Sequence, residues 1–259
     1  MIVEPRVIPT LLLQSEKFVK TTQFSNPIYV GDPVNVLSIF NEFEVDEIVI
    51  LDIQAAKTRT PTPVDQLRKY AEECFIPLAY GGGLTTTEEL SRLFNAGYEK
   101  AVLNSSIFED PVFVQSATST FGSQAIVASI DVAVNTDGKS VMIHGGTKRI
   151  AYSPIDWAKQ AAEYGVGEIL LTSIDREGTG KGYDLELIAE VQEAVDLPVI
   201  AHGGAGSRGD LTKPVLVAGA SASAAGQLFL FQALGRGVLI NYPSRTQIRT
   251  LFGPSAVGC

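Results

Sequence analysis

The sequence predicts an α/β fold in the form of a (β/α)8 TIM barrel, and three observations support this class. Short, nearly continuous apolar runs alternate along the chain with segments of helical spacing, as expected for buried parallel strands and their crossover helices. A glycine-rich turn follows an apolar run twice, at residues 79–83 and 201–206, which favours two similar half-barrels over an open sheet. No linker or change in composition marks a second domain, so we expect one domain over 1–259, with half-barrels at about 1–121 and 122–240.

The first half contains four runs with the length and hydrophobicity of buried strands, at residues 6–13, 48–53, 77–80 and 100–103. A polar loop is expected over 14–30. The next helix, over 34–43, begins with Asp32 as its N-cap and Pro33 in its first turn. Further helices are expected over 65–74 and from Thr86, which has capping-box spacing with Glu89.

The second half repeats this alternation, with strands expected at residues 125–131, 168–172, 198–201 and 220–225. Helices are expected from Asp110-Pro111, from Ser153-Pro154, over 185–194 and within 229–240. The turn signal Asn135-Thr136-Asp137-Gly138 predicts a short two-stranded excursion within 132–152. The tail, residues 242–259, is expected to be irregular at its end.

Composition excludes several functional classes. The formal net charge of -9 disfavours nucleic acid or an anionic membrane as a general partner. Cys74 and Cys259 are too few for a disulfide framework and lack metal-ligand spacing. The N-terminus has no signal-peptide pattern, and no apolar stretch reaches the ~18 residues of a membrane helix. We therefore expect a cytoplasmic protein.

Active sites of such barrels lie at the C-terminal ends of the strands, and six polar residues follow strands there. They are Asp52, Asn104, Asp131, Thr172, Asp175 and Glu177. Asp131 stands out because it ends the apolar run 126–130. Apolar surroundings raise the pKa of a carboxyl group, which suits a general acid or base. A carboxylate that only caps loop amides is the alternative.

The two glycine-rich turns are candidate phosphate sites, because glycine lets the backbone approach a ligand and exposes its N–H groups. Their spacing of about 121 residues favours a phosphorylated small molecule held at both ends, rather than two tight turns alone. Lys20, after the first strand, could meet a phosphate or lie in solvent. His144 and His202 lack a third ligand, so we expect neither a metal nor another cofactor.

Four charged residues mark the opposite ends of the strands. They are Arg6, Glu47, Lys100 and Glu168. Isolated buried charges are costly, so the two cations and two anions should pair at the floor of the barrel. From the residues alone, the simplest interpretation is a plug that stabilises the floor.

Several segments resemble one known family: residues 31–33, 51–53, 80–83, 121–124, 167–176, 182–185 and 203–206. Over about residues 3–230 the chain resembles the cyclase subunit of imidazole glycerol phosphate synthase. In that family a glutaminase docks on the barrel floor, and ammonia passes through the barrel to a bisphosphorylated ribulosyl imidazole-carboxamide. Two aspartates, ending the first and fifth strands, perform ring closure and cleavage.

The resemblance implies roles for individual residues. Asp131 matches the catalytic aspartate of the fifth strand, and Glu177 stands where the family has another aspartate. The other matched site residues are Lys20, Asp52, Asn104 and Thr172. One phosphate loop is matched by Gly83, Asn104 and Ser105. The second is matched by Gly204 and Ala225, with Gly226 in place of a hydroxyl residue. The ammonia gate is matched by Arg6, Glu47, Lys100 and Glu168.

The catalytic aspartate of the first strand is missing. The family's Cys-Leu-Asp-Val reads Thr10-Leu11-Leu12-Leu13 here, so Leu12 stands where the carboxylate belongs. This start, and an ending like residues 238–243, resemble a paralogous branch associated with surface-polysaccharide genes. Its members are associated with a glutaminase and a sugar amidotransferase that amidates a nucleotide-activated sugar.

Three functions remain open from the sequence. The first is a barrel that receives ammonia and supports amidation of a sugar. The second is a cyclase of histidine biosynthesis in which another group replaces the lost acid. Leu12 favours the first over the second. A non-catalytic activator of the glutaminase is the third, which the charged floor disfavours.

Overall fold

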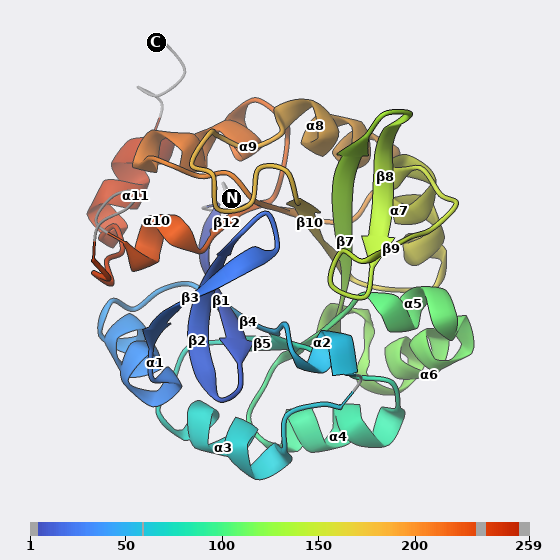
Figure 1. Ribbon diagram of the computed structural model, residues 1–259, viewed down its shortest axis with the longest axis horizontal. Helices are drawn as coiled ribbons and strands as arrows, with labels where there is room; N and C mark the ends of the chain where they lie inside the picture. The colour runs from blue at the N-terminus through green and yellow to red at the C-terminus, as the bar shows by residue number, and fades with distance from the viewer. Residues whose placement is uncertain (1–4, 59, 232–236, 254–259) are drawn as a thin grey trace.

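A closed barrel of eight parallel strands forms the centre of the computed structural model, which describes residues 5–58, 60–231 and 237–253 (Figure 1). In chain order the strands are β1 (Arg6–Gln14), β4 (Ile48–Asp52), β5 (Leu78–Gly81), β6 (Lys100–Leu103), β7 (Ile126–Asn135), β10 (Glu168–Ser173), β11 (Val199–His202) and β12 (Ala222–Ala225). Each pairs in parallel with the next, and β12 pairs with β1. The predicted (β/α)8 barrel is confirmed.

Helices surround the barrel in Figure 1. They are α1 (Pro33–Glu42), α2 (Ala55–Thr58), α3 (Val64–Glu72), α4 (Thr87–Asn95), α5 (Ser105–Glu109), α6 (Pro111–Phe121), α7 (Pro154–Glu163), α8 (Leu185–Ala194), α9 (Lys213–Leu216), α10 (Gln227–Leu230) and α11 (Arg245–Phe252), with 3-10 turns at Ser123–Ala125 and Arg208–Thr212. Two expected caps are present. The Asp32 carboxylate accepts from the Asn35 N–H at 3.3 Å, and Thr86 and Glu89 form a capping box.

Alternate side chains of each strand point into the barrel, because successive residues of a strand face opposite sides. They form an apolar cluster separate from the larger core under the helices: Ile8, Val49, Ala79, Val102, Val127, Leu170, Ile200, Ala222 and Ala224. On β10, Glu168 and Thr172 lie on the same face as Leu170, one at each end. The barrel therefore has a charged floor, an apolar middle and a polar rim.

The loop expected over 14–30 is wrong. This segment forms a hairpin of β2 (Lys17–Thr22) and β3 (Ser25–Gly31), and β2 pairs antiparallel with β1. Phe18 is fully buried and Val19 nearly so, and their packing stabilises the hairpin. The polar residues on either side of them made the segment resemble a loop in the sequence.

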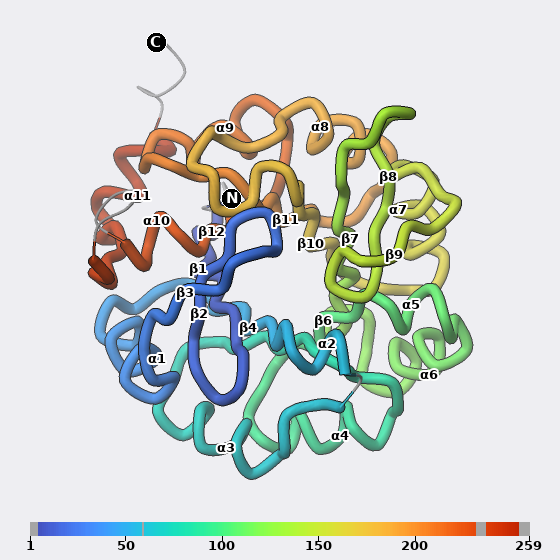
Figure 2. Tube along the Cα trace, in the orientation of Figure 1, coloured from blue at the N-terminus to red at the C-terminus, as the bar shows by residue number. Residues whose placement is uncertain are grey.

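The excursion expected within 132–152 is confirmed. β7 continues to Asn135, and β8 (Gly138–Ile143) pairs antiparallel with it and with β9 (Lys148–Arg149). Figure 2 shows both hairpins at the C-terminal ends of the barrel strands. The β2–β3 hairpin follows β1, and the β7–β8 hairpin continues from the barrel part of β7.

The end of the chain differs from expectation. The helix sought within 229–240 is α10, which ends at Leu230, and Phe231 instead bridges antiparallel to Val238. The tail contains α11, which Ser244 and Gln247 begin with a capping box. Residues 232–236 and 254–259, on which parts of both expectations fall, lie outside the described ranges.

A buried contact joins this end of the chain to its beginning. The Tyr242 hydroxyl donates to the carbonyl oxygen of Val7 at 2.7 Å, and its ring packs on Phe229 with the ring centroids 5.3 Å apart. The segment after β12 therefore returns to the first strand. Within the described ranges, no helix combines the length and hydropathy needed to cross a membrane.

Candidate functional site

A cavity that opens to solvent lies at the C-terminal ends of the strands, and the empty space in it, including the part open to solvent, is about 1070 Å³. It brings together seven of the residues expected from the sequence: Asp52, Gly83, Asn104, Ser105, Asp131, Thr172 and Glu177. A second cavity of about 230 Å³ is lined by Lys20, Gly204, Ala225 and Gly226. Glu177 and His202 line both cavities, so the two spaces meet at these side chains.

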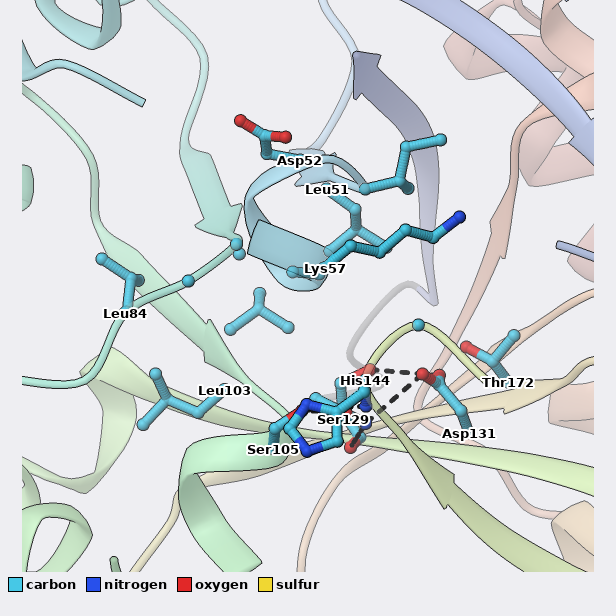
Figure 3. Close-up of a pocket in the computed structure, with 18 of the residues that line it drawn as sticks. Leu51, Asp52, Lys57, Leu84, Leu103, Ser105, Ser129, Asp131, His144 and Thr172 are labelled. Carbon is cyan, nitrogen blue, oxygen red and sulfur yellow. Dashed lines mark hydrogen bonds between the residues drawn. The ribbon is translucent and has the colours of Figure 1, made fainter. Parts of the chain in front are cut away.

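Asp131 is buried at the rim of the large cavity, where β7 continues into its hairpin. Its carboxylate accepts from Asn104 Nδ2 at 3.3 Å and from Ser129 Oγ at 3.4 Å (Figure 3). Burial raises the pKa of Asp131 to about 7, although hydrogen bonds from Thr172 and Ser129 act to lower it. A carboxyl group that exchanges its proton near neutral pH is suited to general acid or base chemistry.

The glycines after β5 are required by close packing. Gly82 has a φ of +150°, and a Cβ there would lie 2.7 Å from the Cβ of Asp52. Gly83 has a φ of +67° and lies against the backbone around Ala55. The turn therefore keeps its backbone at the cavity wall without a side chain in the way.

Asp52 lines the cavity, but its oxygens hold the neighbouring chain. Oδ1 accepts from the N–H groups of Gln54 at 3.0 Å and Ala55 at 2.8 Å, and Oδ2 accepts from the Thr62 hydroxyl. The carboxylate thus caps the start of α2. In this conformation it positions the loop rather than offering a proton acceptor to a ligand.

Lys20 lies on β2 of the β2–β3 hairpin and not in the loop that was expected after the first strand. Its ammonium is buried 2.8 Å from Glu177 Oε1. The other Glu177 oxygen accepts from Thr21 Oγ1 at 3.2 Å and from the Phe24 N–H at 3.1 Å. The pair fixes the β2–β3 hairpin against the turn after β10 and brings a cation to the small cavity.

Asp175 is the expected site residue that lines neither cavity. Its Oδ2 accepts from the Val134 N–H at 2.7 Å. The side chain therefore ties the turn after β10 to the hairpin of β7.

Leu12 lies on β1 with 8% of its surface exposed and lines the large cavity. Arg6, Ile8 and Thr10 precede it at every second position, so all four share the interior face of the strand. The first strand thus contributes an apolar side chain to the rim to which β7 contributes Asp131.

Two imidazoles, those of His144 and His202, lie at the site. The sequence suggested for them only the role of metal ligands. His202 Nδ1 lies 3.2 Å from Thr172 Oγ1, and His144 Nε2 lies 3.0 Å from Glu109 Oε1. In the described residues, no group of three or more metal-binding side chains gathers around either ring. The position of His202 at the end of a buried strand is the sequence signal that could have indicated it.

The four charged residues at the floor pair as expected. Arg6 contacts Glu47 at 2.6 Å and also Glu168, and Lys100 Nζ lies 2.9 Å from Glu47 and 2.8 Å from Glu168. We call these four side chains the floor ring. Both carboxylates are buried, whereas the Arg6 and Lys100 side chains keep 30% and 18% of their surface exposed. Each carboxylate therefore lies between two cations.

The fold and the site define a (β/α)8 barrel protein with open cavities at the C-terminal ends of its strands, where active sites of such barrels lie. Comparison with known proteins identifies the family. A family model described as "Histidine biosynthesis protein" matches residues 6–235. The chain belongs to this family, and its relatives place it among the HisF subunits of imidazole glycerol phosphate synthase.

Three relatives are similar over most of their length. "Putative imidazole glycerol phosphate synthase subunit HisF" of Leptospira interrogans is 42% identical over 251 residues, covering 96% of this chain and 99% of the relative. "Putative imidazole glycerol phosphate synthase subunit hisF2" of Pseudomonas aeruginosa is 44% identical over 242 residues, covering 93% and 96%. "Imidazole glycerol phosphate synthase subunit HisF" of Endomicrobium trichonymphae is 45% identical over 230 residues, covering 88% of each chain.

Inorganic phosphate is expected to bind at both glycine turns, and more weakly at the second, where Gly226 offers no hydroxyl. Ser105→Ala should weaken binding at the first turn by about tenfold, because a hydrogen bond to a charged group contributes about 1.5 kcal/mol or more. Calorimetric titration of both proteins, with a crystal structure grown in phosphate, measures this. If both turns were empty in the crystal structure, or if the wild type and Ser105→Ala bound phosphate with equal affinity, the assignment would be contradicted.

Proposed function

We propose that the chain is an ammonia-using synthase subunit, which receives ammonia from a glutaminase at its floor and delivers it to a phosphorylated acceptor. One observation carries this proposal: the floor ring lies at the N-terminal ends of the same strands whose C-terminal ends open into the two cavities. The barrel interior between them is lined by aliphatic side chains. Uncharged ammonia can cross such a lining far more readily than ammonium, because burying an unpaired ion is costly.

The first candidate acceptor is the ribulosyl imidazole-carboxamide of histidine biosynthesis. The names of the relatives favour it, since each refers to a subunit of imidazole glycerol phosphate synthase. In this function Asp131 transfers a proton during ring closure, and the two glycine turns hold the two phosphates.

The second candidate acceptor is a nucleotide-activated sugar, amidated by a third protein to which the barrel supplies ammonia. Leu12 favours this function, because ring closure in this family uses a carboxylate where the leucine stands. The remaining carboxylates Asp52 and Glu177 are committed to backbone amides, a hydroxyl and Lys20.

Transfer of labelled nitrogen tests the common proposal. The chain is mixed with the glutaminase subunit of an imidazole glycerol phosphate synthase and with glutamine labelled with ¹⁵N at its side-chain amide. Each acceptor is supplied in turn, the sugar together with its amidotransferase. We expect the label in one acceptor, and its identity decides between the two functions.

If the chain stimulated hydrolysis of glutamine but the label appeared in neither acceptor, the proposal would be overturned in favour of a non-catalytic activator. The absence of both complex formation and stimulation would overturn the glutaminase partnership itself.

A further inference from the structure

Three polar side chains lie at one level on three adjacent strands. Thr172 of β10 is the register partner of Asp131 on β7 and of His202 on β11. Residues at equal register in parallel strands point to the same side, so the three side chains meet in the barrel. All three are more than nine-tenths buried, and Figure 3 shows Thr172 beside Asp131.

The Thr172 hydroxyl connects the other two groups. It faces the Asp131 carboxylate across the register of β7 and β10, and its oxygen lies 3.2 Å from His202 Nδ1. A hydroxyl has one proton to donate, and an ionised carboxylate can only accept. When Asp131 is ionised, the Thr172 proton points to it, and the hydroxyl oxygen must accept from Nδ1–H. His202 is then the Nδ1–H tautomer, with no proton on Nε2.

His202 stands where the two cavities meet, which gives its second nitrogen access to a ligand. Nε2 makes no hydrogen bond to any residue in the described part of the chain. Burial, together with the charge of Lys20, lowers the pKa of His202 to about 4. The ring therefore stays neutral at physiological pH, and its state is a choice between two tautomers.

We propose that Asp131, Thr172 and His202 form a proton relay, in which His202 Nε2 takes a proton from a ligand at the junction of the cavities. As the ligand–hydrogen bond breaks, Nε2 gains that proton and Nδ1 releases its own to the Thr172 oxygen. Thr172 passes its original proton to the Asp131 carboxylate. One proton leaves the ligand and one arrives on Asp131, while His202 changes tautomer and never becomes charged.

This inference deepens the proposed function by naming a second group that exchanges protons in the same site. It agrees with a pKa of about 7 for Asp131, which can hold the delivered proton. His202 lies on β11, and β12 separates that strand from β1. The relay therefore acts at a different place from the one that Leu12 occupies.

Nitrogen NMR of the ligand-free full chain, labelled with ¹⁵N at histidine, tests the relay directly. The chain has two histidines, and His144→Gln assigns the His202 signals. We expect the Nδ1–H tautomer at pH 8 and a shift toward the Nε2–H tautomer as Asp131 gains a proton through pH 7. The other charged groups lining the two cavities are Lys20, Asp52, Lys57, Glu109 and Glu177.

Thr172→Val removes the hydroxyl with little change in shape and should abolish the pH-dependent exchange. It should leave the Nε2–H tautomer at pH 8, because a buried Nδ1–H would have no acceptor. Thr172→Ser should keep the wild-type response, and the wild-type titration stands even if the valine variant does not fold. An Nε2–H tautomer at pH 8 in the wild type, or an unchanged titration in a folded valine variant, overturns the relay. A normal tautomer response without nitrogen transfer would leave the relay standing and overturn the proposed function instead.

Discussion

Ammonium-driven turnover of the ribulosyl imidazole-carboxamide substrate is expected to be about 10²–10⁴-fold slower than that of a family member with both aspartates. The physical reason is the loss of one positioned acid or base, because Leu12 can neither donate nor accept a proton. Single-turnover and steady-state rates with saturating ammonium measure this without the glutaminase. A rate equal to that of such a member would contradict the expectation and would favour the histidine-pathway function.

The variant Leu12→Asp supplies the missing carboxylate and should recover part of the rate. Full recovery is not expected, because a catalytic group also needs neighbours that hold it in position. Leu12→Asn is the matched control, since it is polar and similar in size but is not a general base. If both variants gained equally, the effect would come from polarity at the rim and not from proton transfer.

Lys100→Met is expected to lose most of the coupling between glutamine hydrolysis and amidated product, while ammonium-driven amidation changes little. Lys100 lies between the buried Glu47 and Glu168 at the floor of the barrel, the proposed entrance for ammonia, whereas ammonium in solution can reach the cavities from the opposite end. The ratio of the glutamine-driven to the ammonium-driven rate measures the effect. Equal loss with both nitrogen sources, or unchanged coupling, would make the floor ring a structural plug only.

The same substitution is expected to lower the free energy of unfolding by ~3–5 kcal/mol, because it leaves the buried carboxylates of Glu47 and Glu168 with one cation, Arg6, in place of two. Lys139→Met is the matched control, since Lys139 also contacts two glutamates, Glu186 and Glu190, whose side chains are 77% and 41% exposed. Exposed ion pairs contribute ~1 kcal/mol or less. Denaturant unfolding of both variants separates loss of stability from loss of coupling.

The parts of the fold that depend on local sequence were predictable. Asp32 and Thr86 marked helix starts, and apolar runs marked the barrel strands, because both signals arise within a few neighbouring residues. The strand ends then indicated Asp131 and the floor ring. In a parallel barrel, the position of a residue at a strand end fixes which end of the molecule it reaches.

The parts that depend on distant contacts were not predictable. Lys20 is buried only because Glu177, 157 residues later, meets it, and the polar sequence around Lys20 therefore resembled a loop. The partnership of His202 with Thr172 depends on the register between β10 and β11, which no spacing within the chain reveals. Asp175 showed the reverse: its position suggested the site, but a backbone amide of the neighbouring hairpin binds its carboxylate.

The contact between Tyr242 and Val7 bears on how this protein forms during synthesis. The first strand emerges from the ribosome long before β12, its neighbour in the closed barrel, and before the tyrosine that anchors it. Until then one edge of β1 has no strand to pair with, and exposed edges invite association with other chains. Because Arg6 begins that strand, its place in the floor ring is fixed only after β12 and Tyr242 have been made.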